Sequence, residues 1–139
     1  GGIPVAWIPV DSRRLDVYRR IARADTPESI ASLSADLSSA YGKLPRRTKL
    51  LFDLATIRVL AAEHEITSVV RDGLDVVFTC RRPDSIKSRL AKAPGALRLV
   101  DAKHGDAREV WYRPAKRVAE SEHVVRTLLK RLSVAEVLP

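Results

Sequence analysis

The spacing of apolar residues in the first half of the chain predicts three helices, over residues 12–24, 27–40 and 46–64. In each range, apolar side chains recur every three or four positions and polar side chains fill the positions between them. Thr26 and Pro27 suit the cap and the first turn of the second helix. The third helix has the widest apolar stripe, so we expect it to be the most buried. The expected core positions are Leu15, Tyr18 and Ile21 or Ala22 in the first helix, Ile30, Leu33 and Leu37 in the second, and Leu50, Leu51, Leu54, Ala55, Ile57, Leu60 and Ala61 in the third.

The residues before the first helix contain Pro4 and Pro9, which exclude a helix there. The residue before a proline is also biased toward extended conformations. We therefore expect an extended segment over residues 1–11, with Trp7 and Ile8 as the side chains that anchor it to the rest of the chain.

Beyond residue 65 the apolar pattern changes to short runs rich in Val and Phe, which are typical of strands. Asp72-Gly73 between the first two runs is a hairpin-turn signal. This order predicts an α+β fold, in which an N-terminal three-helix segment is followed by a ββαββα unit with a small, mainly antiparallel sheet. The expected elements of that unit are strands over 66–71 and 74–80, a helix over 84–91, strands over 96–101 and 109–113, and a helix over 118–132.

A tight corner, Ser39 to Pro45, separates the second helix from the third. Gly42 can adopt a positive φ at no steric cost, which suits the position just after a helix, and Pro45 suits the start of the next one. Tyr41 lies close to the register of the apolar stripe of the second helix, so its ring is expected to pack between the two helices.

The composition is that of a folded domain with a basic surface. The chain has 139 residues, 45% of them hydrophobic, and a net charge of +8 that is spread over both halves. This size suits one domain, which we expect over residues 12–139. The opening Gly-Gly and the lack of methionine suggest a piece of a longer protein. Cys80 is the single cysteine, so an internal disulfide is excluded and a small buried side chain is expected. We expect an intracellular protein without membrane contact, because no apolar run approaches a membrane span.

Motifs for catalysis or cofactor binding are missing from the sequence. It contains neither a Gly-x-x-x-x-Gly-Lys-Ser/Thr phosphate loop nor a Gly-x-Gly-x-x-Gly run. The histidines, His64, His104 and His123, have no cysteine or carboxylate at metal-ligand spacing. We therefore expect no catalytic, cofactor or metal site in this chain.

Basic pairs leave open an alternative function, in which the chain is a nucleic-acid-binding module. Trp111 and Tyr112 lie near the last pair in sequence, and exposed aromatic rings can stack on bases. Adjacent strand residues point to opposite faces, so one of these two rings should be buried and the other at most half-exposed. The residues that could contact phosphates are Arg46, Arg47, Arg81, Arg82, Lys116 and Arg117.

Several runs, read together, resemble the C-terminal (TRCF) domain of bacterial transcription-repair coupling factors, the Mfd family. Their order and spacing agree with the family pattern over nearly the whole chain, most specifically over the first 65 residues. The matching runs are Ala6-Trp7-Ile8-Pro9, Arg14-Leu15, Tyr18-Arg19-Arg20-Ile21-Ala22, Tyr41-Gly42-Lys43-Leu44-Pro45 and Leu54-Ala55-Thr56-Ile57-Arg58.

The resemblance implies a regulatory, non-catalytic domain that docks on the N-terminal UvrB-like module of the same parent chain and masks the surface that recruits UvrA. The parent would be an ATP-dependent DNA translocase in the cytoplasm, whose upstream motor binds ATP and Mg and whose other modules contact RNA polymerase and DNA. The docking residues implied for this sequence are Asp36, Ser39 and Tyr41. Asp36 keeps the acidic character of the family position, whereas Ser39 replaces an acid, Ala40 an arginine and Glu65 a glycine.

Overall fold

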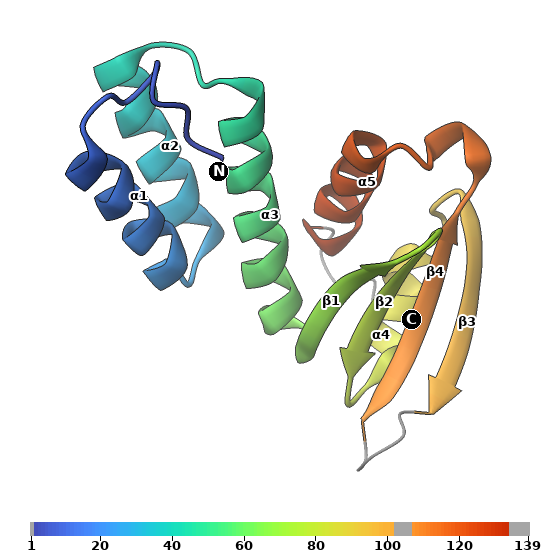
Figure 1. Ribbon diagram of the computed structural model, residues 1–139. Coiled ribbons are helices and arrows are strands. Elements are labelled where there is room, and N and C mark those ends of the chain that lie inside the picture. Colours follow the sequence, from blue (N-terminus) through green and yellow to red (C-terminus); the bar gives the residue numbers. More distant parts are fainter. Residues whose placement is uncertain (1, 102–106, 134–139) are drawn as a thin grey trace. The chain divides into compact units, whose positions relative to one another are not determined.

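The computed structural model describes residues 2–101 and 107–133, and these contain five α-helices, one short 3-10 helix and four strands (Figure 1). The α+β order predicted from the sequence is confirmed. In chain order the elements are α1 (Asp11–Arg23), α2 (Pro27–Tyr41), α3 (Arg46–Glu63), β1 (Ile66–Asp72), β2 (Asp75–Cys80), α4 (Pro83–Leu90), β3 (Gly95–Asp101), β4 (Arg108–Pro114), η1 (Lys116–Val118) and α5 (Ser121–Ser133).

The chain divides into two compact units, one over residues 1–59 and one over residues 60–139. The boundary falls inside α3, so the last turn of this helix belongs to the second unit. The first unit otherwise holds α1 and α2, and the second holds the sheet with α4 and α5.

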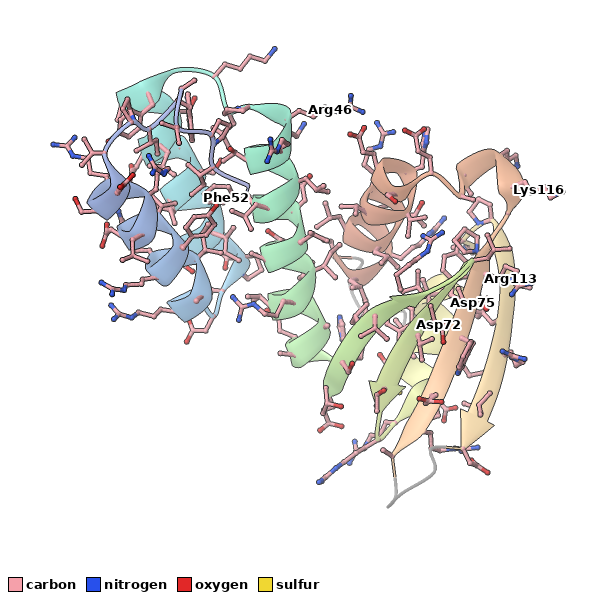
Figure 2. The ribbon with its side chains drawn as sticks, in the orientation of Figure 1. Arg46, Phe52, Asp72, Asp75, Arg113 and Lys116 are labelled. Carbon is pink, nitrogen blue, oxygen red and sulfur yellow. The ribbon has the colours of Figure 1, made fainter. Side chains whose placement is uncertain are left out.

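The first unit is held together by an apolar core to which all three helices contribute. Phe52 of α3, labelled in Figure 2, lies in this core. Among the three helices, α3 has the most buried residues, as predicted. Two expected core residues are instead half-exposed: Leu15 in α1 and Leu54 in α3 are each 49% exposed. The buried residues of this core are Ile3, Ile8, Val17, Ile21, Ile30, Leu33, Leu37, Phe52, Ala55 and Val59.

The segment before α1 is not extended throughout, in contrast to the prediction. The N–H groups of Trp7 and Ile8 both donate to the carbonyl of Pro4, at 3.1 Å each, which forms a turn. Proline excludes a regular helix, but its fixed φ is compatible with a turn. Ile8 is fully buried and Trp7 packs against the core, so both residues anchor the segment as expected.

The four strands form one antiparallel sheet in the order β1-β2-β4-β3. Phe78 and Val110 are directly opposite each other in the register of β2 and β4, and both are fully buried. α4 packs against β4 and β3, and it lies behind the sheet in Figure 1. Ile86 and Leu90 of α4 are also buried, so the core of this unit lies between α4 and that face of the sheet.

The last helix begins later than the sequence suggested, at Ser121 rather than at residue 118. The N–H of Val118 donates to the carbonyl of Ala115 at 2.9 Å, an i to i−3 bond that belongs to the 3-10 turn η1. The bond from Val124 N–H to the Glu120 carbonyl, four residues back, marks the start of α5. The apolar spacing continues through both pieces, which is why it did not reveal the break.

Candidate interaction surface

The corner between α2 and α3 has the geometry that its sequence predicts. Gly42 follows α2 with φ +88°, and its N–H donates to the Ser38 carbonyl at 2.9 Å. Pro45 lies one residue before α3, and its carbonyl accepts from Lys49 N–H at 2.9 Å. Pro45 therefore precedes the first turn of α3 instead of lying within it.

Tyr41, the last residue of α2, is held by side chains from the first part of the chain. The indole N–H of Trp7 donates to the Tyr41 carbonyl at 2.9 Å, and the two rings lie 5.8 Å apart between centroids. Arg13 of α1 donates to the Tyr41 hydroxyl at 3.3 Å. This hydrogen bond raises the pKa of Arg13 above its ordinary value. Tyr41 is thus half-buried against Trp7, and the carboxyl end of α2 is capped by a residue 34 positions away in sequence.

The three predicted docking residues all lie on the last two turns of α2, but only Asp36 and Ser39 share its exposed face, because Tyr41 packs against the core. Asp36 and Ser39 are both exposed, and residues three apart on a helix lie on one face. Tyr41 ends the same helix. We call this end of α2, which presents Asp36 and Ser39 to solvent and finishes at Tyr41, the α2 edge (Asp36, Ser39 and Tyr41).

Beside the α2 edge, the structure shows a groove that the sequence did not reveal. It has a volume of about 400 Å³ and lies between the carboxyl-terminal part of α1 and the outer side of α2. Asp36 lines it, so the α2 edge and the groove share one residue. The lining residues are Arg20, Arg23, Ala24, Asp25, Ser29, Ser32, Leu33 and Asp36. A signal was present, because Arg20 and Arg23 are three apart and share a face of α1, but the partner face on α2 cannot be inferred from that spacing.

The predicted basic pairs belong to different elements, one pair in the first unit and two in the second. Arg46 and Arg47 begin α3, and Figure 2 labels Arg46 there. In the second unit, Arg81-Arg82 follow β2 and Lys116-Arg117 follow β4. Because β2 and β4 are antiparallel, these two pairs lie at opposite ends of the sheet. The two pairs of the second unit therefore do not form one continuous basic patch.

Trp111 lies on the face of the sheet opposite to Phe78 and Val110, whereas Tyr112 lies on the buried face. Tyr112 is 1% exposed and Trp111 is half-buried, as the alternation predicts. The guanidinium of Arg98 lies 4.8 Å from the centre of the Trp111 ring, a cation–π contact. The indole N–H donates to Glu109 at 3.3 Å.

Next to Trp111, Arg113 holds a buried carboxylate. Its guanidinium donates to both carboxylate oxygens of Asp75, at 3.0 and 2.9 Å (Figure 2). These bonds, helped by the charges of Arg113, Arg98 and Arg71, hold the pKa of Asp75 below its ordinary value, although burial acts in the opposite direction. The pair is a bidentate structural contact between β2 and β4.

The described residues contain no group of three potential metal ligands. His104 lies outside them. Cys80 is 1% exposed, and burial raises the pKa of its thiol, which fits the predicted role as a small core side chain. Within the same described part of the chain, no helix is long and apolar enough to cross a membrane.

Comparisons with known proteins agree on one family. A family profile for the TRCF domain matches residues 2–90. Transcription-repair-coupling factors from Mycobacterium bovis and Mycobacterium tuberculosis are each 33% identical to the chain over 97 residues, which cover 68% of this chain. The matched region is only 8% of the length of those relatives.

A solved structure shows the same fold. The crystal structure of a C-terminal domain of transcription-repair coupling factor superposes with a TM-score of 0.78, covering 94% of this chain and 84% of that one. The sequence identity to it is 13%, so this likeness describes the fold alone.

Proposed function

The chain belongs to the TRCF domain family, and from this premise we propose that it is a regulatory, non-catalytic domain of a transcription-repair coupling factor. Its role would be to bind another part of a longer parent chain. The observation that supports this role most directly is the α2 edge. Asp36 and Ser39 are exposed there, while Trp7 and Arg13 fix the end of the helix.

In this proposal, the α2 edge docks on an N-terminal UvrB-like module of the parent and covers the surface that recruits UvrA. A fixed helix end suits such a contact, because a surface that is already ordered loses little conformational entropy on binding. Asp36 supplies the charged contact. Ser39 adds a hydroxyl in place of the carboxylate of the family, so we expect a weaker charge-dependent contribution at that position.

The motor activity would lie elsewhere in the parent. The matched relatives are named transcription-repair-coupling factors, and the chain spans 8% of their length. We propose that the parent is an ATP-dependent DNA translocase that uses ATP and Mg and contacts RNA polymerase and DNA through its other parts. Such a role would be carried out in the cytoplasm.

The test is the affinity of UvrA for the full-length parent, measured with and without residues 1–139. Removal of the domain is expected to strengthen UvrA binding, because the masked surface becomes available. Asp36→Lys should also strengthen UvrA binding, because it reverses the charge of the α2 edge. Glu63→Lys makes the same charge change at an exposed position outside the α2 edge and should have no effect. Unchanged UvrA affinity after removal of the domain would refute the proposal.

A second function, nucleic-acid binding, is favoured by one observation. The Arg98 guanidinium lies over the Trp111 ring, and a base could stack against this pair. If this face binds single strands, the affinity should fall steeply with salt and Trp111→Ala should weaken it. A titration of the chain with single-stranded DNA at about 50 mM salt that shows no binding would exclude this function.

A further inference from the structure

The groove between α1 and α2 has walls of opposite charge. Arg20 and Arg23 project from α1 on one side, and Asp36 projects from α2 on the other. Asp25, also in the lining, lies in the connection between the two helices. All four side chains are exposed, and among the described residues none of them forms an ion pair or a hydrogen bond with another side chain. Their charges are therefore available to a binding partner.

Both walls are held firmly where the helices meet. Arg58 of α3 donates to the carbonyls of Ile21 and Ala24, at 3.0 and 3.1 Å, and so satisfies the carboxyl end of α1. Thr26 caps α2 by accepting from the Ser29 N–H at 3.1 Å, and the Ser29 hydroxyl donates back to the Thr26 carbonyl at 2.9 Å. The two charged walls are thus attached to fixed helix ends.

Short side chains leave the space between the walls open. Ser29 and Ser32 are exposed residues of α2 that line the groove, and beneath them Leu33 is 4% exposed. A serine side chain ends two atoms from the backbone, so a partner segment can approach α2 closely at these positions. The groove is therefore an open depression that side chains of a partner can enter.

We propose that this groove seats a segment of the N-terminal module of the parent that carries two side chains of opposite charge. An acidic side chain would lie against Arg20 and Arg23, and a basic side chain would lie against Asp36. This inference rests on the proposed function and extends it, since it names the chemistry of the docking partner and adds two residues of α1 to the docking surface.

The argument for this occupant is charge complementarity. A partner segment with charges of one sign would meet an attractive wall on one side and a repulsive wall on the other. A segment with both signs is attracted by both walls, and in only one orientation across the groove. Asp36 also belongs to the α2 edge, so a single partner can contact the edge and the groove together.

The experiment uses the full-length parent, with UvrA affinity as the readout of docking. The test variant is Arg20→Glu/Arg23→Glu, with Asp36→Lys and removal of residues 1–139 as references. Reversing the charges of Arg20 and Arg23 makes both residues repel the acidic side chain of the partner. This change should weaken docking about tenfold and strengthen UvrA binding accordingly. Arg20→Gln/Arg23→Gln should give a smaller change in the same direction. The double reversal Lys87→Glu/Lys92→Glu, at exposed positions on or next to α4, controls for the change in net charge.

The outcomes separate the two proposals. If both arginine variants strengthen UvrA binding and the control Lys87→Glu/Lys92→Glu does not, the two-charge partner is supported. If removal of the domain and Asp36→Lys strengthen UvrA binding but both arginine variants do not, this inference is wrong while the proposed function stands. If even removal of the domain has no effect, the proposed function itself fails. Circular dichroism of the isolated chain, compared between each variant and the wild type, shows whether an effect comes from misfolding.

Discussion

Replacement of Glu65 by glycine should stabilise the protein. Glu65 has φ +58° and is the one non-glycine residue with a positive φ in the described ranges. It follows the end of α3, where its N–H donates to the Ala62 carbonyl at 3.1 Å, and it precedes Ile66 at the start of β1. The chain must take a left-handed conformation here to leave the helix and enter the sheet, and a glutamate Cβ makes that conformation costly.

Three terms determine the size of the effect. Relief of the left-handed Cβ penalty should contribute about 1–2 kcal/mol. Glycine has more conformational freedom in the unfolded chain, and this offsets about 0.5–1 kcal/mol of that stabilisation. The ion pair between Glu65 and Arg82, at 3.6 Å with side chains 58% and 83% exposed, is lost. Such an exposed pair contributes only about 0.3 kcal/mol to the free energy of unfolding. The free energy of unfolding should therefore rise by about 0.5 kcal/mol, which corresponds to an increase of about 2 °C in Tm.

The measurement is denaturant unfolding of the wild type, Glu65→Gly and Glu65→Ala, followed by circular dichroism. Glu65→Ala removes the same ion pair but keeps a Cβ, so it should be slightly less stable than the wild type. The difference between glycine and alanine isolates the backbone term and should be about 0.5–1 kcal/mol in favour of glycine. A glycine variant no more stable than the alanine variant would refute the explanation.

Four further predictions follow from local contacts. Gly95→Ala should lower the unfolding free energy by about 2 kcal/mol or more, because a Cβ there would lie 2.2 Å from the Arg113 carbonyl oxygen. Gly73→Ala, where a Cβ meets nothing within 4 Å, should cost only the strain of its positive φ in the same unfolding assay. The depressed pKa of Asp75 contributes stability above its unfolded pKa that is lost as pH falls, so acid unfolding below about pH 4 should be less steep in Asp75→Asn. Cys80 should react with a thiol reagent such as DTNB only at the rate of unfolding, and fast labelling of the native chain would contradict its burial.

The element types could be predicted from the sequence because their signals are local. Helical spacing, alternating strands and the turn glycine Gly42 each involve residues within a few positions of one another. The change of period near residue 65 separated the helical segment from the sheet. The resemblance also marked position 65 as a glycine in the family, and the positive φ of Glu65 now gives the physical reason for that preference.

What the sequence did not reveal depends on contacts between distant elements. Leu15 fits the apolar spacing of α1 but lies outside the stripe formed by Val17 and Ile21, and spacing alone does not fix the exact face. The cap from Trp7 to Tyr41 joins residues that are 34 positions apart. The groove likewise requires the relative placement of two helices, which no periodicity encodes.

The positions of charges along α1 and α2 distinguish residues whose charge also stabilises their own helix from residues whose charge does not. Acids near the start of a helix and bases near its end are favoured by the helix dipole. Asp11 and Glu28 lie in the first turns of α1 and α2, and Arg20 and Arg23 lie in the last turn of α1. Asp36 follows no such rule, since it lies beyond the first turn of α2, is exposed and has no ion pair among the described residues. The helix dipole gives no reason for a carboxylate at this position, so the charge of Asp36 is open to the proposed docking contact.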